Sequence, residues 1–167
     1  MGKSWYFGQV SDSDKRGFQF WKMDLEGNTV IDSLWKHIQP RCQALAASDL
    51  RVVRQYANGQ TYGVGGEPHV DDVRAGCYTL LYYPMEEWKS EWDGETVFYD
   101  ERGEVILAVV PRPNRAVFFD ARIRHVGRAP SRSCAALRVT LAYKVEATAW
   151  EDLRHLARAK KALRSPE

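Results

Sequence analysis

From residue 50 onward the sequence alternates short apolar runs with turn-forming residues, and this alternation constrains the fold more than any other feature. The runs are rich in Val, Tyr, Phe, Leu and Thr, which favour strands, while Gly, Pro, Asp and Asn fall between them. They cover residues 51–56, 77–83, 96–99, 105–110, 116–119 and 137–145. Several short strands at this spacing favour an antiparallel sandwich or barrel over a βαβ array.

Helical patterns precede this β-rich body. Apolar residues recur at helical spacing over residues 30–38, after Asn28 as a suitable N-cap, and the pattern is expected to stop at Pro40. A second, shorter helical stretch is expected over residues 42–47. The helical part of the chain is therefore expected to cover residues 28–47.

Both ends of the chain carry further elements. The opening segment 5–23 mixes aromatic and charged residues and is expected to hold one or two strands. The tail begins with a capping-box pattern at residues 148–151, so a closing helix is expected over residues 148–164. The expected fold is mainly β with flanking helices, and its body covers residues 50–146.

Composition limits the class of protein. The 167 residues suffice for one domain with a substantial core, so a single domain is expected over residues 1–167. A hydrophobic content of 44%, a charged content of 28% and a net charge of +2 argue against wholesale disorder. They also give no reason to expect nucleic acid or an anionic membrane as a partner.

The cysteines and the N-terminal sequence indicate the cellular compartment. Cys42, Cys77 and Cys134 are widely spaced and lack a CxxC pair, which favours reduced thiols in a reducing compartment. The sequence has no secretory h-region and no apolar stretch of transmembrane length. We therefore expect a cytoplasmic protein without membrane association.

A metal-binding pattern lies in the segment His69-Val70-Asp71. On an extended chain, residues i and i+2 point to the same side, so an imidazole and a carboxylate can converge on one ion. Together with a distant second His they would form a facial 2-His-1-carboxylate triad, which leaves positions on iron open. Alone, an H-x-D match arises by chance in many proteins, and a polar loop pair is the plainer interpretation.

The other histidines narrow the choice of a second imidazole. The chain has four His residues, and His37 and His155 lie in expected helices, where a partly exposed structural role is favoured. His125 follows an apolar strand instead. It is the candidate for the third ligand.

Arg138 places a cation on the last apolar strand, next to Thr140 in the alternating pattern. An unpaired buried charge is costly, so this Arg requires a partner. One alternative is an Asp or Glu of the same chain, and the other is bidentate capture of a ligand carboxylate.

The order His69-x-Asp71, His125, Arg138-x-Thr140 resembles that of the Fe(II)/2-oxoglutarate-dependent dioxygenases, in particular the small prolyl-4-hydroxylase-like branch. Further matches to that branch fall in the same order along the chain, from about residue 54 to residue 144. They are the segments 56–62, 78–84, 92–98 and 111–119. The resemblance implies a double-stranded β-helix, or jelly roll, as the fold.

The resemblance also implies roles for the candidate residues at an iron centre. His69, Asp71 and His125 would bind Fe(II), which 2-oxoglutarate chelates and which reacts with O2, with ascorbate as an auxiliary reductant. Asp72 is a competing carboxylate one position along. The presence of Asp71 argues against halogenation, because halogenating relatives lack that carboxylate. Hydroxylation is then the default outcome, with desaturation and ring closure as alternatives.

For 2-oxoglutarate, the resemblance implies that Arg138 pairs with the C5 carboxylate. The hydroxyls of Thr140 and Tyr83 would assist, and Tyr56 or Tyr62 would supply a further hydrogen bond. Arg128 and Arg132 compete with Arg138 as the anchor, although both lie in a turn.

The expected reaction is hydroxylation of an unactivated C–H bond of a small molecule, such as an amino acid or a natural-product intermediate. Hydroxylation of a prolyl residue in a peptide or protein is the alternative. A cupin-like metalloprotein that does not use 2-oxoglutarate, and a non-enzymatic binding module, are kept as further alternatives. Nucleic-acid repair is disfavoured, because the last strand lacks the RxNxTxR pattern of those relatives.

Clues to the substrate are few. Six arginines surround His125 in the sequence, and they indicate either an anionic substrate or solvated loop cations, of which the second is favoured. They are Arg112, Arg115, Arg122, Arg124, Arg128 and Arg132. Trp88 and Trp92 fit a substrate-facing wall and a buried core position equally well. The oligomeric state is not readable from the sequence.

Overall fold

The computed structural model of the chain describes residues 4–9 and 19–148. Within these ranges the chain is mainly β, as expected, with one α-helix. The elements in chain order are β1 (Tyr6–Gln9), β2 (Phe20–Asp24), α1 (Thr29–Ala46), β3 (Leu50–Gln60), β4 (Cys77–Tyr83), a short 3-10 helix η1 (Ser90–Trp92), β5 (Thr96–Tyr99), β6 (Val105–Val109), β7 (Arg115–Asp120), β8 (His125–Gly127) and β9 (Arg138–Ala147). The helix expected over residues 148–164 lies, apart from Thr148, outside the described residues.

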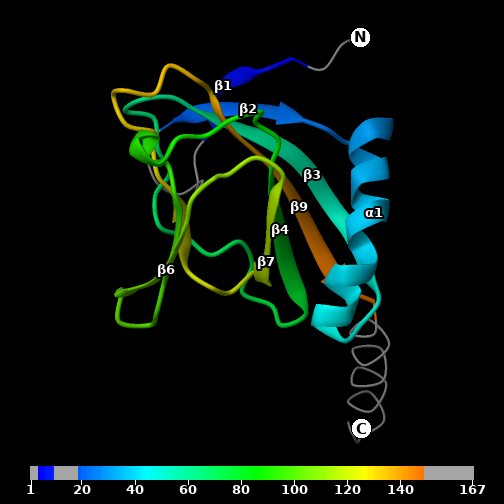
Figure 1. Cartoon of the computed structure of the whole chain (residues 1–167). Coiled ribbons are helices and arrows are strands. Elements are labelled where there is room, and N and C mark those ends of the chain that lie inside the picture. The colour runs from blue at the N-terminus through cyan, green and yellow to red at the C-terminus, as the bar shows by residue number, and fades with distance from the viewer. Residues whose placement is uncertain (1–3, 10–18, 149–167) are drawn as a thin grey trace, which may run out of the picture.

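The strands form two antiparallel sheets that face each other. The larger sheet has six strands in the order β1-β2-β3-β9-β4-β7, and the smaller has three in the order β6-β5-β8. Figure 1 shows β6 on the far side of β4 and β7 from α1, so the two sheets form separate layers. This arrangement agrees with the expected jelly roll.

Helix α1 covers the outer face of the larger sheet beside β3 and β9 (Figure 1). Asn28 caps it, because its side-chain oxygen accepts hydrogen bonds from the backbone N–H groups of Val30 and Ile31. Trp35 stacks on Tyr143 of β9 at 5.6 Å between ring centroids, and the Tyr143 hydroxyl donates to the Ile31 carbonyl at 2.9 Å. The helix thus shields one side of the sheet from water and leaves the other side for the inner cavity.

The expected break at Pro40 is wrong. α1 runs without interruption from Thr29 to Ala46 and includes Pro40, so the two expected helical stretches form one helix. Pro40 lacks an N–H and so cannot bond the carbonyl of Lys36. It lies on the exposed side of the helix, where water can solvate that carbonyl. The packing of Trp35 and Cys42, one before and one after the proline, keeps both halves on the sheet.

Strands β3 and β9 carry the inner face that positions the site. Their pairing puts four pairs of residues on that face in succession. From one end of the strands to the other, the pairs are Arg54 with Lys144, Tyr56 with Ala142, Asn58 with Thr140, and Gln60 with Arg138. The intervening residues of β9, such as Leu141 and Tyr143, face α1.

None of the helices in the described part of the chain is both long enough and apolar enough to span a membrane.

Candidate metal centre and its cavity

The three candidate metal ligands come from two segments that the backbone joins. His69 and Asp71 lie between β3 and β4, and His125 opens β8. The N–H of each His donates to the carbonyl of the other, at 3.0 Å from His69 and 2.9 Å from His125. The N–H of Asp71 donates to the Ala121 carbonyl at 2.9 Å. Main-chain hydrogen bonds therefore place all three side chains on one side of the cavity.

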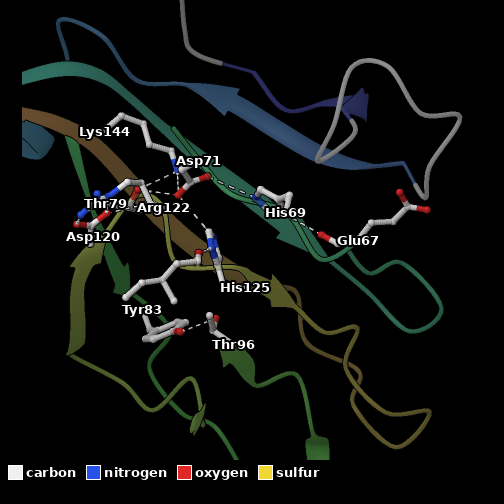
Figure 2. A network of polar contacts seen from close by, with 11 residues as sticks. Glu67, His69, Asp71, Thr79, Tyr83, Thr96, Asp120, Arg122, His125 and Lys144 are labelled. Carbon is white, nitrogen blue, oxygen red and sulfur yellow. Dashed lines mark hydrogen bonds and ion pairs between the residues drawn. The ribbon is translucent and has the colours of Figure 1, made fainter. Parts of the chain in front are cut away.

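The side chains converge as a metal site requires. One potential ligand atom from each of His69, Asp71 and His125 lies within 4.8 Å of the others. The Nε2 atoms of the two imidazoles lie 3.4 Å and 3.5 Å from the Asp71 carboxylate oxygens (Figure 2). Each Nδ1 lies within hydrogen-bond distance of a backbone carbonyl, that of Glu67 at 2.7 Å and that of Ile123 at 2.9 Å. A donor Nδ1–H leaves Nε2 with its lone pair toward the carboxylate, which is the tautomer that binds metals.

The surroundings set the charge of these groups. Burial lowers the pKa of His125 to about 4, against the opposing effect of Asp71, so this imidazole is neutral near pH 7. Burial alone would raise the pKa of Asp71, but the close His69 imidazole and the positive charge of Lys144 hold it well below its usual range. Two imidazole nitrogens with free lone pairs and an ionised carboxylate are a donor set that suits Fe(II).

Two neighbours hold the Asp71 carboxylate in place. The hydroxyl of Thr79, a fully buried residue of β4, donates to Asp71 Oδ2 at 2.6 Å. Lys144 of β9 forms an ion pair with the same oxygen and also donates to the Thr79 hydroxyl at 3.2 Å. Figure 2 shows both side chains meeting Asp71 from the side away from the histidines. Sequence reasoning missed both residues, although alternation from Arg138 places Lys144 on the same face of its strand.

The ligands open into a cavity of about 220 Å³ between the sheets. Its wall contains His69, Asp71, His125, Arg138 and the inner-face residues of β3 and β9. Asn58, on this wall, has a buried side-chain oxygen without a hydrogen-bond partner among the described residues. An unpaired buried acceptor in a cavity is a position where a ligand or a water completes the hydrogen bonding.

Arg138 lies at one end of this cavity and is only 2% exposed. Its guanidinium donates to the Gly94 carbonyl at 2.5 Å, the Gln60 side-chain oxygen at 2.6 Å and the Thr96 hydroxyl at 2.9 Å. Desolvation lowers its pKa. The charge of Glu95 opposes this effect, but no carboxylate in the described part of the chain forms an ion pair with Arg138.

Gly94 makes the position of Arg138 possible. Its φ of +77° is a conformation that L side chains rarely adopt, and a Cβ there would lie 3.1 Å from Arg138 Cδ. Trp88 is buried beside the same position, where its Cζ2 would also lie 3.1 Å from that Cβ, and its Nε1 donates to the Asp93 carbonyl at 3.0 Å. Neither Trp88 nor Trp92 lines the cavity, so of the two expected roles for Trp88 the core role fits the structure.

The remaining expected contacts of 2-oxoglutarate fall in different places. Thr140 and Tyr56 line the cavity, and Thr140 is buried next to Arg138. Tyr83 is fully buried behind the wall, and its hydroxyl donates to Thr96 at 2.8 Å (Figure 2). Tyr62 is 61% exposed and does not line the cavity.

The competing candidates lie outside the cavity. Asp72 forms an ion pair with Arg74 at 2.7 Å, and the hydrogen bond from Arg74 lowers the pKa of Asp72 to about 2. Arg128 and Arg132 are exposed. Of the two candidate carboxylates, Asp71 is therefore the one that faces the cavity. Of the three candidate anchor arginines, it is Arg138.

The sequence matches a known family over this same region. The family model described as the 2OG-Fe(II) oxygenase superfamily matches residues 53–150, which is more than half of the chain. The chain belongs to the 2OG-Fe(II) oxygenase superfamily. The expectation of an Fe(II)- and 2-oxoglutarate-dependent oxygenase that uses O2 is thereby confirmed. A comparison with curated proteins found no match.

Solved structures of this superfamily share the fold. A prolyl-4-hydroxylase of Pseudomonas putida has a TM-score of 0.61 at 16% identity, over 83% of this chain and 76% of that one. A prolyl hydroxylase of Trichoplax adhaerens, solved with a hypoxia inducible factor peptide, has a TM-score of 0.60 at 19% identity. The match covers 97% of this chain and 74% of that one. SnoN, a non-heme alpha-ketoglutarate-dependent epimerase from nogalamycin biosynthesis, has a TM-score of 0.64 at 16% identity. The match covers 85% of this chain and 67% of that one. At these identities the likeness shows the fold alone.

Proposed function

We propose that this oxygenase hydroxylates a small molecule, with His69, Asp71 and His125 as the Fe(II) ligands and Arg138 as the anchor of the 2-oxoglutarate C5 carboxylate. The observation that carries the proposal is the combination in one cavity of a His-Asp-His cluster and a buried Arg whose hydrogen-bond acceptors are all neutral. A buried guanidinium needs an anion, and the co-substrate of the family is a dicarboxylate.

The residues around Arg138 would orient the carboxylate. Gln60, Thr96 and Gly94 fix the plane of the guanidinium, so its remaining N–H groups are held in one direction. Thr140 lies on the cavity wall beside Arg138 and would add a hydroxyl. Tyr83 would act through Thr96, because its hydroxyl bonds that side chain and does not line the cavity.

The residues around the candidate metal ligands would orient those ligands before the metal binds. The carbonyls of Glu67 and Ile123 hold the histidine tautomers, and Thr79 and Lys144 hold one carboxylate oxygen of Asp71. When bound, Fe(II) and 2-oxoglutarate supply the oxygen activation and oxidative decarboxylation that drive C–H oxidation. The protein contributes orientation and a partly buried site.

Peptidyl proline is the second candidate substrate. Two of the similar structures are prolyl hydroxylases and one is an epimerase of antibiotic biosynthesis, so the shared fold does not choose between them. The charged lining of this cavity favours a small polar molecule. A succinate-formation assay on the Fe(II)-loaded protein, with pools of small metabolites and of Pro-containing peptides, separates the two. Stimulation by the peptide pool alone would reject the small-molecule proposal.

The anchor role is tested with Arg138→Gln, which keeps hydrogen-bonding capacity and removes the charge. We expect 2-oxoglutarate to bind the Mn(II)-loaded variant at least 100-fold more weakly than the wild type, as loss of a buried charge pair costs about 3 kcal/mol. Calorimetry measures this affinity, and Mn(II) affinity without 2-oxoglutarate should stay within about threefold. Arg128→Gln is the matched control. Unchanged 2-oxoglutarate affinity in Arg138→Gln would contradict the assignment, and so would a Mn(II) site that survives His69→Ala with Asp71→Ala.

A further inference from the structure

The cavity carries cations at both ends of the β3 and β9 pairing. Arg138 and Gln60 form the last inner pair, and Arg54 and Lys144 form the first. Lys144 lies six positions after Arg138 on β9, which corresponds to about 20 Å of extended strand between their backbones. Lys144 reaches Asp71, so a dicarboxylate anchored at Arg138 and chelating a metal at Asp71 would span the cavity as far as Lys144 and leave Arg54, the strand partner of Lys144, without a ligand.

The charges of the cavity wall do not balance. Among the described residues, the wall contains the cations Arg54, Arg138 and Lys144, and Asp71 is its one carboxylate. Fe(II) and 2-oxoglutarate carry equal and opposite charges, so filling the site with both leaves the excess of positive charge unchanged. A cavity lined by one sign of charge raises the local concentration of ligands with the opposite sign.

Arg54 is an exposed residue of the cavity wall, and its guanidinium lies over the ring of Tyr56. Its guanidinium carbon lies 4.5 Å from the centre of the Tyr56 ring, and the one carboxylate whose pKa its charge lowers, Asp24, forms its ion pair with Lys22. A guanidinium stacked on an aromatic ring keeps its N–H edge free for a bidentate acceptor. Lys144 lies 5.9 Å from the same ring. Lys22 also approaches this ring, at 5.2 Å, but it is paired with Asp24 at 2.6 Å.

The six arginines near His125 in the sequence do not contribute positive charge to the cavity wall. None of the six lines the cavity. Arg122 pairs with Asp120 at 2.6 Å, and Arg115 donates to the Val110 carbonyl at 2.8 Å. The cations that face the cavity come from the paired strands instead.

From these observations we infer that Arg54, stacked on Tyr56, binds an anionic group of the organic substrate, so that the substrate is a small carboxylic acid or phosphate ester. This inference rests on the proposed function, because it assigns Arg138 to the co-substrate and leaves Arg54 for the second ligand. The anion at Arg54 would fix the substrate at the mouth while its C–H bonds face the metal ligands.

The test uses full-length protein loaded with redox-inert Zn(II) and saturated with 2-oxoglutarate. Ligand-observed NMR then compares matched probes that differ in charge, each at up to about 10 mM, so that weak binding is detected. N-acetyl amino acids are compared with N-acetyl amino acid amides, and sugar phosphates with the free sugars. We expect the anionic member of at least one pair to bind about tenfold more tightly. The pair that responds distinguishes carboxylate from phosphate.

Arg54→Gln should abolish the preference for the anionic probe, whereas Arg112→Gln, at an exposed position off the cavity wall, should retain it. Equal binding of charged and neutral probes, no binding of any anionic probe, or a preference that survives Arg54→Gln would each overturn the inference. A loss of 2-oxoglutarate affinity in Arg54→Gln as large as in Arg138→Gln would also overturn it. Failure of the wild type to bind 2-oxoglutarate would remove the proposed function itself, whereas normal 2-oxoglutarate binding without anion preference removes this inference alone.

Discussion

Asp71 illustrates how single residues build the candidate centre. Its neighbours within the H-x-D motif follow from the alternation of an extended chain, so His69 and Asp71 could be paired from the sequence. Its contacts with Thr79 and Lys144 depend on where β4 and β9 pass, since those residues face each other across the pairing of the two strands. No local pattern encodes that register, which explains why sequence reasoning missed them.

Replacing Thr79 with Val tests whether the hydroxyl orients Asp71. Val keeps the branched shape that suits a strand, and it leaves one carboxylate oxygen without its 2.6 Å donor. We expect Mn(II) affinity to fall by about 10- to 100-fold, as is typical when a hydrogen-bond partner of a metal ligand is lost. Calorimetric titration measures the affinity, and circular dichroism checks the fold. Restoration by Ser, which supplies the hydroxyl, is expected, and wild-type affinity in the Val variant would refute the role.

At the level of elements, the agreement between the expected and the observed strands depends on the length of the strand. The apolar runs at 77–83 and 96–99 coincide with β4 and β5, because alternation and β-branched content identify strands locally. β8 has three residues and becomes a strand through its pairing with β5, so it gave no pattern of its own. The break expected at Pro40 failed for the opposite reason: a local signal was overridden by packing on both sides.

Pro40 gives a prediction about α1. Replacing this exposed proline with Ala restores the N–H that can bond the Lys36 carbonyl and removes a poor helix former. Part of the gain is offset because proline also restricts the unfolded chain. We expect the free energy of unfolding to rise by about 1 to 2 kcal/mol, measured by urea denaturation. A lower stability in the Ala variant would mean that the proline makes a favourable contact that outweighs the lost hydrogen bond.

For the whole molecule, the candidate site ties together parts that lie far apart in the chain. The candidate metal ligands come from the segment after β3 and from β8 of the smaller sheet, and the proposed anchor Arg138 comes from β9 of the larger sheet. The unfolded chain does not present these groups together, so ligands that bind them stabilise the folded state by mass action.

This linkage predicts a thermal shift. Mn(II) and 2-oxoglutarate together, each at about 100 times its dissociation constant, should raise Tm by at least 5 to 10 °C, since one ligand at that excess contributes about 2.7 kcal/mol. Differential scanning fluorimetry measures the change. We expect the additional shift from 2-oxoglutarate to require the metal and to disappear in Arg138→Gln. An equal shift from 2-oxoglutarate without metal would show that it binds elsewhere.

The reciprocal backbone hydrogen bonds between His69 and His125 have a consequence for engineering. Residues directly opposite on antiparallel strands keep their separation whatever their side chains are, because the main chain sets it. Cys at either position would thus present a thiolate from the same backbone point as the imidazole that it replaces. Softer ligands shift preference from iron toward zinc, so these two positions offer a way to change the metal without redesigning the scaffold.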